Sequence, residues 1–338
     1  HRIFVKILGT IEKMNIMQIY TKLVHNVIFV VIICLIASCD HNTKQQRIYL
    51  WGSPSFLHHA DFFMNESGEG AGIKDTVVYV TKDGGKKWDG PISLNGYRYI
   101  IYPSSNLRNR YKIYNGTLYF YVVSNDEFFE KRRSKEIPKR HLAKFNLSTY
   151  ELTVNSEGFS DVDDIFIKES RLYARVEGSN IVECDDSLNI SSRSKLPFTC
   201  LSLIPTSKGY CTLHPNSVKF VEDDLVLTVD FNKSGMTGPI FSSAEGEIFI
   251  YRSYETESAI LKISESKVSE EICKTFPHGT YIDFFSSGDA FFISTICDNY
   301  KSYLVYSLDG GKTWSRRKLP LSIASTCHLA YYDGKLFY

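Results

Sequence analysis

Hairpin turns recur along most of this chain at a nearly regular spacing. Short runs of aromatic and β-branched residues flank each turn, as they do in antiparallel strand pairs. The turns are marked, at successive steps of 54, 39, 37, 42 and 46 residues, by Gly116, Ser170, Gly209, Gly246, Gly288 and Gly334. Turn residues of this kind supply the positive φ angles that a tight hairpin needs. A repeat of roughly 40 to 50 residues with four strands per unit is typical of a β-propeller.

The repeat therefore predicts an all-β fold, a β-propeller of six or seven four-stranded blades. A β-sandwich also contains many short strands, but nothing makes it repeat one hairpin at this step. The spacing allows six blades between residues 46 and 320, and the hairpin of residues 326–338 opens another. The sequence leaves the choice between six and seven blades open.

Composition is ordinary for a folded protein and excludes some partners. The 338 residues include 39 Lys plus Arg and 38 Asp plus Glu, and 43% of the chain is hydrophobic. A net charge of +1 provides no large field of one sign, so we expect no nucleic-acid partner. The oligomeric state stays undetermined at this level.

The N-terminal part is expected to be a targeting segment. The apolar run 27–37 has eleven residues, which is too short for a membrane-spanning helix of about 20 residues. It fits the apolar core of a secretory signal peptide. We expect residues 1–16 to be an untranslated upstream stretch, 17–38 a cleaved signal peptide, 39–46 a short tether, and 47–338 a propeller truncated at its C-terminus.

The end of this segment, Ile36-Ala37-Ser38-Cys39, resembles a bacterial lipobox. The resemblance implies that Cys39 carries acyl chains that anchor the protein to a membrane. It also implies a place in the bacterial cell envelope, either periplasmic or surface-facing, with the choice between inner and outer membrane open. A signal peptide that ends by chance in a cysteine is the alternative.

Two segments, 81–88 and 307–314, share the pattern S/T-x-D-G-G-K-x-W. The pattern resembles the Asp box of sialidases and other BNR-repeat propellers, where it joins the third and fourth strands of a blade away from the ligand. The resemblance implies a structural role for the boxes' defining residues, which are Thr81, Asp83, Gly85 and Trp88 in the first and Ser307, Asp309, Gly311 and Trp314 in the second.

The same resemblance raises the alternative of a sialidase-like glycoside hydrolase. Such enzymes grip a sugar carboxylate with three arginines and use an aspartate as acid/base with a tyrosine nucleophile. The nearest matches are Asp61 for the acid/base and Arg47 for the first arginine, although the motifs around both are incomplete. Arg98, Arg110 and Arg252 are available as further arginines, but no motif selects them.

Because this catalytic set is incomplete, the favoured interpretation is a non-catalytic binding or scaffold module for a protein or a glycan. The loops of a propeller converge on one face around a channel, which suits such a role. A narrower version is protection of the host against a toxic effector in the envelope, and an assembly factor is a third class of function. The enzyme alternative uses Asp61 as its acid/base.

Metal and cofactor sites are not expected. The cysteines after Cys39 show no C-x-x-C spacing, and disulfides and free thiols are equally compatible with them; they are Cys184, Cys200, Cys211, Cys273, Cys297 and Cys327. The acidic run 161–164 is expected to be a solvated turn. The basic run 128–140 is expected to be a solvated loop, with contact to anionic lipid headgroups or to an acidic protein as the alternative.

Overall fold

The computed structural model describes residues 49–51, 60–100, 111–222, 225–264, 269–297, 301–319 and 330–337. All of them belong to the second of two compact units, Ile48–Tyr338. The first unit, His1–Arg47, lies outside the described residues, and so do Cys39 and Arg47. In the described part of the chain, no helix is both long and apolar enough to cross a membrane.

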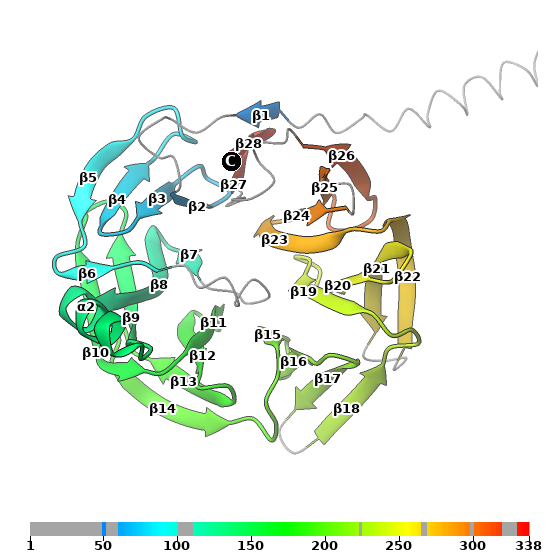
Figure 1. Ribbon diagram of the computed structural model, residues 1–338, viewed down its shortest axis with the longest axis horizontal. Coiled ribbons are helices and arrows are strands. Elements are labelled where there is room, and N and C mark those ends of the chain that lie inside the picture. Colours follow the sequence, from blue (N-terminus) through cyan, green and yellow to red (C-terminus); the bar gives the residue numbers. More distant parts are fainter. Residues whose placement is uncertain are drawn as a thin grey trace, which may run out of the picture. The chain divides into compact units, whose positions relative to one another are not determined.

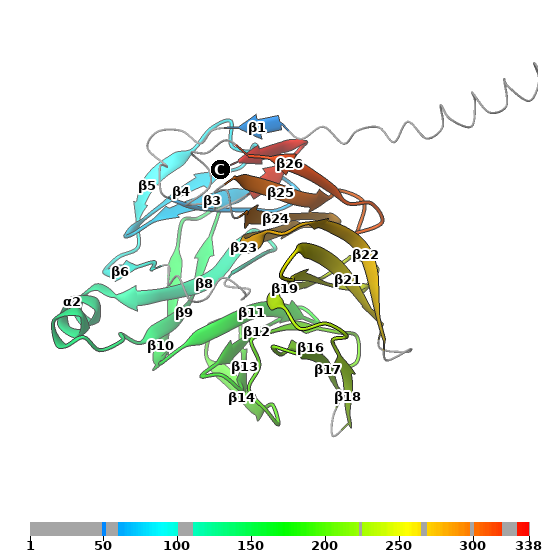
Figure 2. The ribbon, with the colours of Figure 1, turned by 45° about the vertical axis from the view of Figure 1, so that its right-hand side comes forward.

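Six antiparallel sheets surround a common centre, in chain order, as the blades of a β-propeller (Figure 1). The first strand of each blade is the innermost, and the later strands lie progressively further out. In an oblique view, turned by 45° from that of Figure 1, consecutive blades follow one another around the ring (Figure 2). The predicted all-β propeller is confirmed, with six blades.

The first three blades cover residues 61–195. Blade 1 consists of β2 (Asp61–Met64), β3 (Gly70–Lys74), β4 (Val77–Thr81) and β5 (Asp89–Ser93). Blade 2 consists of β6 (Tyr97–Arg98), β7 (Lys112–Tyr114), β8 (Thr117–Ser124), β9 (Arg140–Asn146) and β10 (Leu152–Phe159), and both β6 and β7 pair with β8 as a divided inner strand. Blade 3 consists of β11 (Val162–Lys168), β12 (Arg171–Val176), β13 (Asn180–Cys184) and β14 (Ile190–Lys195).

The next three blades cover residues 202–318. Blade 4 consists of β15 (Ser202–Pro205), β16 (Tyr210–Leu213), β17 (Ser217–Glu222) and β18 (Leu225–Asp230). Blade 5 consists of β19 (Met236–Ser242), β20 (Ile248–Ser253), β21 (Glu257–Ser264) and β22 (Ser269–Pro277). Blade 6 consists of β23 (Thr280–Ser287), β24 (Ala290–Ile296), β25 (Ser302–Ser307) and β26 (Ser315–Lys318).

A three-stranded sheet lies between blade 6 and blade 1 (Figure 1). It contains β27 (Ala330–Tyr332) and β28 (Lys335–Phe337), and β28 pairs in parallel with β1 (Tyr49–Trp51). Strand β27 contacts the inner strands β2 and β23 on its two sides. This terminal sheet thus joins the last blade to the first with segments from both ends of the second unit.

The hairpins that organise the sequence are the inner hairpins of the blades. Each of the six marked turns joins an inner strand to the next strand of its sheet, in blades 2 to 6 and in the terminal sheet. In blade 2 this inner strand is β7. Gly116 and Gly334 adopt φ angles of 67° and 75°, which a side chain with a Cβ rarely tolerates. Gly209 serves a different purpose, because a Cβ there would lie 2.0 Å from the carbonyl oxygen of Val221.

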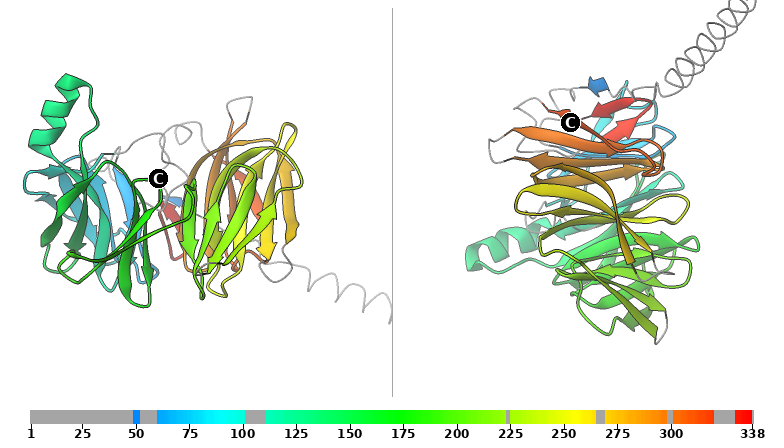
Figure 3. Two further views of the ribbon diagram at one scale, coloured as in Figure 1. Left: turned by 90° about the horizontal axis from the view of Figure 1, so that it is seen from below. Right: turned by 90° about the vertical axis from the view of Figure 1, so that its right-hand side faces the viewer.

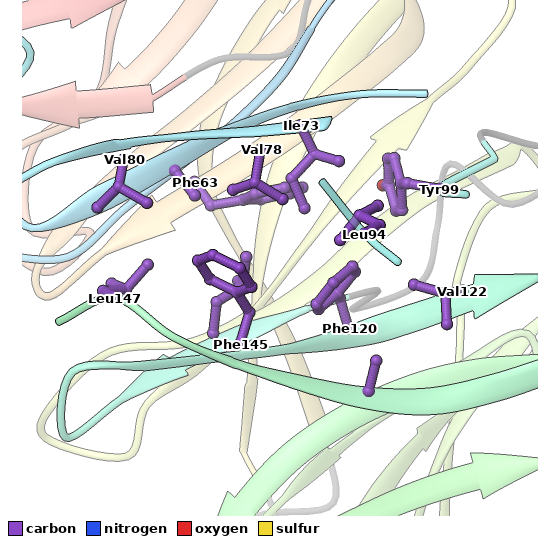
Figure 4. Packing of buried hydrophobic residues seen from close by; sticks show 13 residues of the cluster. Phe63, Ile73, Val78, Val80, Leu94, Tyr99, Phe120, Val122, Phe145 and Leu147 are labelled. Carbon is purple, nitrogen blue, oxygen red and sulfur yellow. The ribbon is translucent and has the colours of Figure 1, made fainter. Parts of the chain in front are cut away.

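Apolar side chains fill the space between neighbouring blades. Figure 4 shows the cluster between blades 1 and 2, where Phe63 and Val78 face Phe120 and Phe145. Each of these side chains is at most 3% exposed, and burying such a side chain stabilises the fold by about 1.5–3 kcal/mol. Similar clusters lie at each of the other junctions between neighbouring blades. The blades are therefore held together by apolar contact on both of their faces.

One α-helix is described, α2 (Asn125–Ser134), inserted between β8 and β9. It stands beyond the strand ends of blade 2 (Figure 3). The sequence led us to expect a solvated loop here; the exposure is as expected but the conformation is helical. None of the ten helical residues is buried, so the helix has no apolar stripe for a periodicity argument to find.

Candidate functional site

The two faces of the ring carry different features. Because the strands of each blade alternate in direction, every inner strand begins on one face, which we call the leading face. Asp61 is the first residue of β2 and lies at this end. The β4–β5 and β25–β26 turns, which contain the two repeated boxes, lie on the opposite face. The candidate acid/base and the boxes are thus separated by the thickness of the propeller.

Three inner strands carry an aspartate directly before two large apolar residues. These are Asp61 in β2, Asp164 in β11 and Asp283 in β23. Asp61 and Asp164 are 2% and 0% exposed, respectively. Burying a carboxylate is costly unless it has partners, so each of these positions needs a structural or functional explanation.

Asp164 is explained by blade packing. Nε of Arg175 lies 2.6 Å from Oδ2 of Asp164, and its Nη1 lies 3.0 Å from Oδ2 of Asp163. Arg175 also donates to the carbonyl oxygens of Cys200 and Leu201 at 3.1 Å each, in the segment that leads into blade 4. The expectation of a solvated acidic turn at 161–164 is therefore wrong for Asp163 and Asp164, which form a buried ion cluster.

Asp61 and Asp283 lie near the phenol of Tyr111, just before β7. The pKa of Tyr111 is raised, first by burial and then by the negative charges of Asp283 and Asp61. The Tyr111 ring packs on Phe63, with 4.2 Å between ring centroids. Tyr111 of blade 2 thus packs on blade 1 and is influenced by the charges of carboxylates in blades 6 and 1.

The surroundings of Tyr111 favour the protonated form of its phenol. Burial and the charges of Asp283 and Asp61 raise the pKa of Tyr111, and a tyrosine nucleophile would need a neighbouring base, a lowered pKa or a metal ion to activate it. In its protonated form the phenol O–H can donate a hydrogen bond.

The arginines available for a carboxylate clamp are used elsewhere. Arg252 is fully buried and donates to the carbonyl oxygens of Pro215 at 2.8 Å and Lys233 at 3.0 Å, which ties blade 5 to blade 4. Arg98 donates to Asn125 at 2.8 Å. Arg47 and Arg110 lie outside the described residues. Neither Arg98 nor Arg252 is thus placed to grip a sugar carboxylate.

The second box is closed by its own hydrogen bonds. Oγ of Ser307 donates to Oδ1 of Asp309 at 2.8 Å and accepts the N–H of Gly311 at 2.9 Å. Oδ1 of Asp309 also accepts the N–H of Thr313 at 2.9 Å. Nε1 of Trp314 donates to the carbonyl oxygen of Gly311 at 2.9 Å. The turn therefore satisfies its polar groups internally.

The first box repeats these contacts. Oγ1 of Thr81 donates to Asp83 at 3.1 Å and accepts the N–H of Gly85 at 2.8 Å. Nε1 of Trp88 donates to the carbonyl oxygen of Gly85 at 3.0 Å. The N–H of Lys87 bonds to the Asp83 carboxylate at 2.9 Å and is the largest cause of its lowered pKa. The two boxes thus share one geometry as well as one pattern.

The box tryptophans differ in their packing. Trp314 is 8% exposed and lies against Phe241, Phe249 and Phe291, with centroid distances of 6.0, 6.1 and 6.1 Å. Trp88 meets Phe62 edge-on at 5.9 Å. Trp314 therefore joins blade 6 to blade 5 as well as closing its own turn.

The cysteines in the described residues are free thiols, which decides between the two states left open for them. They are Cys184, Cys200, Cys211, Cys273 and Cys297; Cys327 lies outside these residues. Burial raises the pKa of Cys184 to about 12, which disfavours the thiolate form through which thiols react. The described residues hold no group of three or more side chains suited to a metal ion.

Sequence reasoning identified Asp61 but missed Asp283 and Tyr111. The sequence signal that could have indicated Asp283 is the recurrence of an aspartate before two large apolar residues on inner strands. The sequence has no comparable signal for Tyr111, because its role depends on how blades 6, 1 and 2 meet.

Comparisons with known proteins support the propeller fold. The sequence matches no protein-family model and no curated protein. A structure of YCF48 bound to a D1 peptide is similar, with a TM-score of 0.50 at 11% identity over 81% of this chain and 85% of the other. YCF48 from Cyanidioschyzon merolae gives a TM-score of 0.50 at 13% identity over 81% and 89% of the two chains. At these identities the likeness shows the propeller fold alone.

Proposed function

We propose that this chain is a non-catalytic binding module whose central leading face holds a polypeptide segment with cationic side chains. The observation that carries the proposal is that two inner strands, β2 and β23, place Asp61 and Asp283 where their charges act on Tyr111, which packs on Phe63 of β2. Their carboxylates and phenol match ammonium, guanidinium and amide groups. A glycan is the other class of ligand for this face.

Two further facts support a protein ligand. A propeller presents a rigid ring on which ligands bind without large rearrangement, and the inner strands here are fixed by buried ion pairs and apolar clusters. One structural neighbour, YCF48, is described as bound to a D1 peptide. We extend this mode of binding to the present chain as part of the proposal.

The proposal also includes the family and the location of the protein. The shared geometry of the two boxes supports a place among Asp-box, BNR-repeat propellers of sialidase-like ancestry. The lipobox-like residues 36–39 support a lipoprotein anchored through Cys39 in a bacterial cell envelope. In this view the protein presents its propeller to the periplasm or to the cell surface.

Peptide binding tests the central site directly. The purified full chain is titrated by fluorescence anisotropy with a set of labelled decapeptides that contain two arginines, two glutamates or neither. We expect binding of the arginine peptides to weaken about tenfold in Asp61→Asn and in Asp283→Asn, since about 1.4 kcal/mol corresponds to tenfold. Asp230→Asn and Glu271→Gln remove exposed carboxylates from the outer strands β18 and β22 and serve as matched controls.

The outcomes distinguish the classes of ligand. An equal loss of peptide binding in the control variants would show that the effect depends only on the net charge of the protein, which would contradict a central site. A preference for glutamate peptides would also contradict it. Hydrolysis of a fluorogenic sialoside, or of another sugar substrate in a panel, would contradict a non-catalytic binding module. If Asp61→Ala abolished this hydrolysis, the protein would be a glycosidase.

The anchor is tested separately. Cys39→Ala is expected to move the protein from the membrane fraction to the soluble fraction, because the acyl chains supply most of the membrane affinity. Membrane association that persists in Cys39→Ala, together with no mass increase on wild-type protein, would contradict lipidation.

A further inference from the structure

Helix α2 is fixed to the propeller at its first turn. Nε of Arg98 donates to Oδ1 of Asn125 at 2.8 Å, and the Arg98 guanidinium lies 4.2 and 4.8 Å from the ring centroids of Phe128 and Phe129. Nη1 of Arg98 also lies 3.4 Å from Asp75 in blade 1. The first turn is thus held against the propeller, while the rest of the helix stands beyond it (Figure 3).

The return segment is fixed as well. The N–H of Lys139 donates to Oε1 of Glu127 at 2.8 Å, and Lys135 ends the helix in the left-handed conformation with φ of 62°. These contacts define a compact protrusion, residues 129–139, which we call the α2 tip.

The α2 tip exposes large apolar side chains. Phe129 is 50% exposed and Ile137 is 68% exposed. A propeller of this size has ample interior in which to bury two such residues. Their placement on a protrusion, next to charged residues, indicates a contact surface.

The charges on the tip are mostly positive and mostly unpaired. Residues 129–139 contain five cations and two carboxylates, and Glu136 is paired with Lys131. Arg132, Arg133 and Lys135 are exposed. Throughout the described ranges, no carboxylate forms an ion pair with any of these three.

We infer that the α2 tip is a second membrane contact, which rests on an anionic phospholipid surface independently of any acyl chain at Cys39. Clustered Lys and Arg side chains are attracted to anionic headgroups, and a neighbouring aromatic or aliphatic side chain enters the boundary between headgroups and acyl chains. The tip combines both features at one end of a short helix. Cations without apolar neighbours would suit a soluble acidic partner equally well, so Phe129 and Ile137 favour the lipid.

The experiment compares amide hydrogen exchange in two kinds of vesicle. The full chain is reconstituted in vesicles of phosphatidylcholine alone or with 30% phosphatidylglycerol, and attachment is checked by flotation. We expect amides of residues 125–137 to exchange several-fold more slowly on the phosphatidylglycerol vesicles. The slowing should fade in 0.5 M NaCl, since salt at this level screens exposed charges beyond about 4–5 Å.

Two sets of variants test the residues. Arg132→Gln/Arg133→Gln/Lys135→Gln should abolish the slowing, because each cation near an anionic surface changes affinity about fivefold. Phe129→Ser/Ile137→Ser should reduce it. The matched control Lys195→Gln/Lys274→Gln/Lys318→Gln removes three exposed charges from blades 3, 5 and 6 and should keep it. All substituted side chains are exposed, and circular dichroism checks that each variant is folded.

Three results would overturn the inference. One is equal exchange of α2 in both kinds of vesicle. Another is a control triple variant as defective as the tip variant, which would reduce the effect to net charge. The third is equal slowing by poly-glutamate on phosphatidylcholine vesicles, which would identify an acidic polypeptide as the partner. Failure of the central peptide site would leave all of these outcomes unchanged.

Discussion

Nε of Arg175 lies 2.6 Å from Oδ2 of Asp164, and both side chains are at most 1% exposed. The same guanidinium reaches Asp163 and two carbonyl oxygens in the segment that leads into blade 4. Ser202, the first residue of β15, donates to the other oxygen of Asp164 at 2.9 Å. This one cluster therefore fixes blade 3 to blade 4 at the leading face.

Removing the arginine should strongly destabilise the protein. Arg175→Met leaves two buried carboxylates without their cation, and breaking a buried pair in this way costs about 3–5 kcal/mol. The control is Arg171→Met in the same blade, whose Nη1 lies 2.6 Å from Glu183 but whose side chain is 65% exposed; exposed pairs contribute about 0–1 kcal/mol. Urea unfolding followed by tryptophan fluorescence measures both. A cost below 1 kcal/mol for Arg175→Met would contradict the role of the cluster.

The fold was predictable because its repeat unit is local. Each blade begins with a hairpin whose turn must adopt unusual backbone angles, so residues such as Gly116 and Gly334 mark it in the sequence. Strand pairing within a blade joins neighbours along the chain, and the spacing of the turns then indicates a propeller of six or seven blades. Helix α2 escaped prediction because it packs almost nothing into the core and so shows no apolar periodicity.

The site was less predictable because it depends on contacts between blades. Asp61 was found through a resemblance to a motif, but Asp283 lies more than 200 residues away in the sequence and meets Tyr111 only when the ring closes. The acidic run 161–164, which was predicted to be a solvated turn, shows the same limit. Asp163 and Asp164 appear solvated until Arg175 is placed beside them.

Substitution at Gly311 tests the contact between blades 5 and 6. Gly311 has φ of 89°, and a Cβ there would lie 2.5 Å from Cζ of Phe249. Gly311→Ala therefore combines left-handed strain, about 1–2 kcal/mol, with overpacking of about 1–3 kcal/mol. Gly246→Ala is the matched control, because Gly246 has φ of 82° and a Cβ there would meet no atom within 4 Å.

The difference between the two alanine variants isolates the packing contribution. We expect Gly311→Ala to lower the free energy of unfolding by at least 1 kcal/mol more than Gly246→Ala, in the same urea experiment. Equal costs would show that backbone strain alone explains both glycines, and that the second box does not press against Phe249.

The carboxylate of Asp309 should matter for stability rather than for ligand binding. It accepts hydrogen bonds from the side chains of Ser307 and Thr313 at 2.8 and 2.5 Å, and from the N–H of Thr313 at 2.9 Å. Burial alone would raise the pKa of Asp309, but the bonds from Thr313 and Ser307 hold it below its usual value. Asp309→Ala should cost about 2–3 kcal/mol, since hydrogen bonds to charged groups contribute about 1.5–3 kcal/mol.

The pH dependence of Asp309 has a definite sign. A carboxylate with a lowered pKa stabilises the folded state above its ordinary pKa, and the contribution disappears as the pH falls through the folded value. The stability difference between wild type and Asp309→Ala should therefore shrink below about pH 4. Binding of peptides at the central site should be unchanged in this variant at pH 7, and a large loss of binding there would contradict a purely structural box.

His214 gives the protein a separate sensitivity at mildly acidic pH. Burial and, second, the positive charge of Lys219 together lower the pKa of His214 to about 4. The imidazole ring packs edge-on against Phe198, with 5.0 Å between centroids. In the unfolded chain the histidine takes up a proton near pH 6.5, whereas the folded protein resists it, so stability falls as the pH drops from about 7 to 4. The loss of stability reaches about 1–3 kcal/mol at pH 4, and the lower figure reflects the partial exposure of the ring.

Two variants test this sensitivity. His214→Gln does not titrate and should remove this part of the pH dependence, while Lys219→Met should reduce it because the pKa of His214 in the folded protein rises. Urea unfolding at pH 7.5, 6, 5 and 4.5 measures the slope, a range that lies above the window of Asp309. The same slope in His214→Gln as in wild type would place the acid sensitivity elsewhere in the protein.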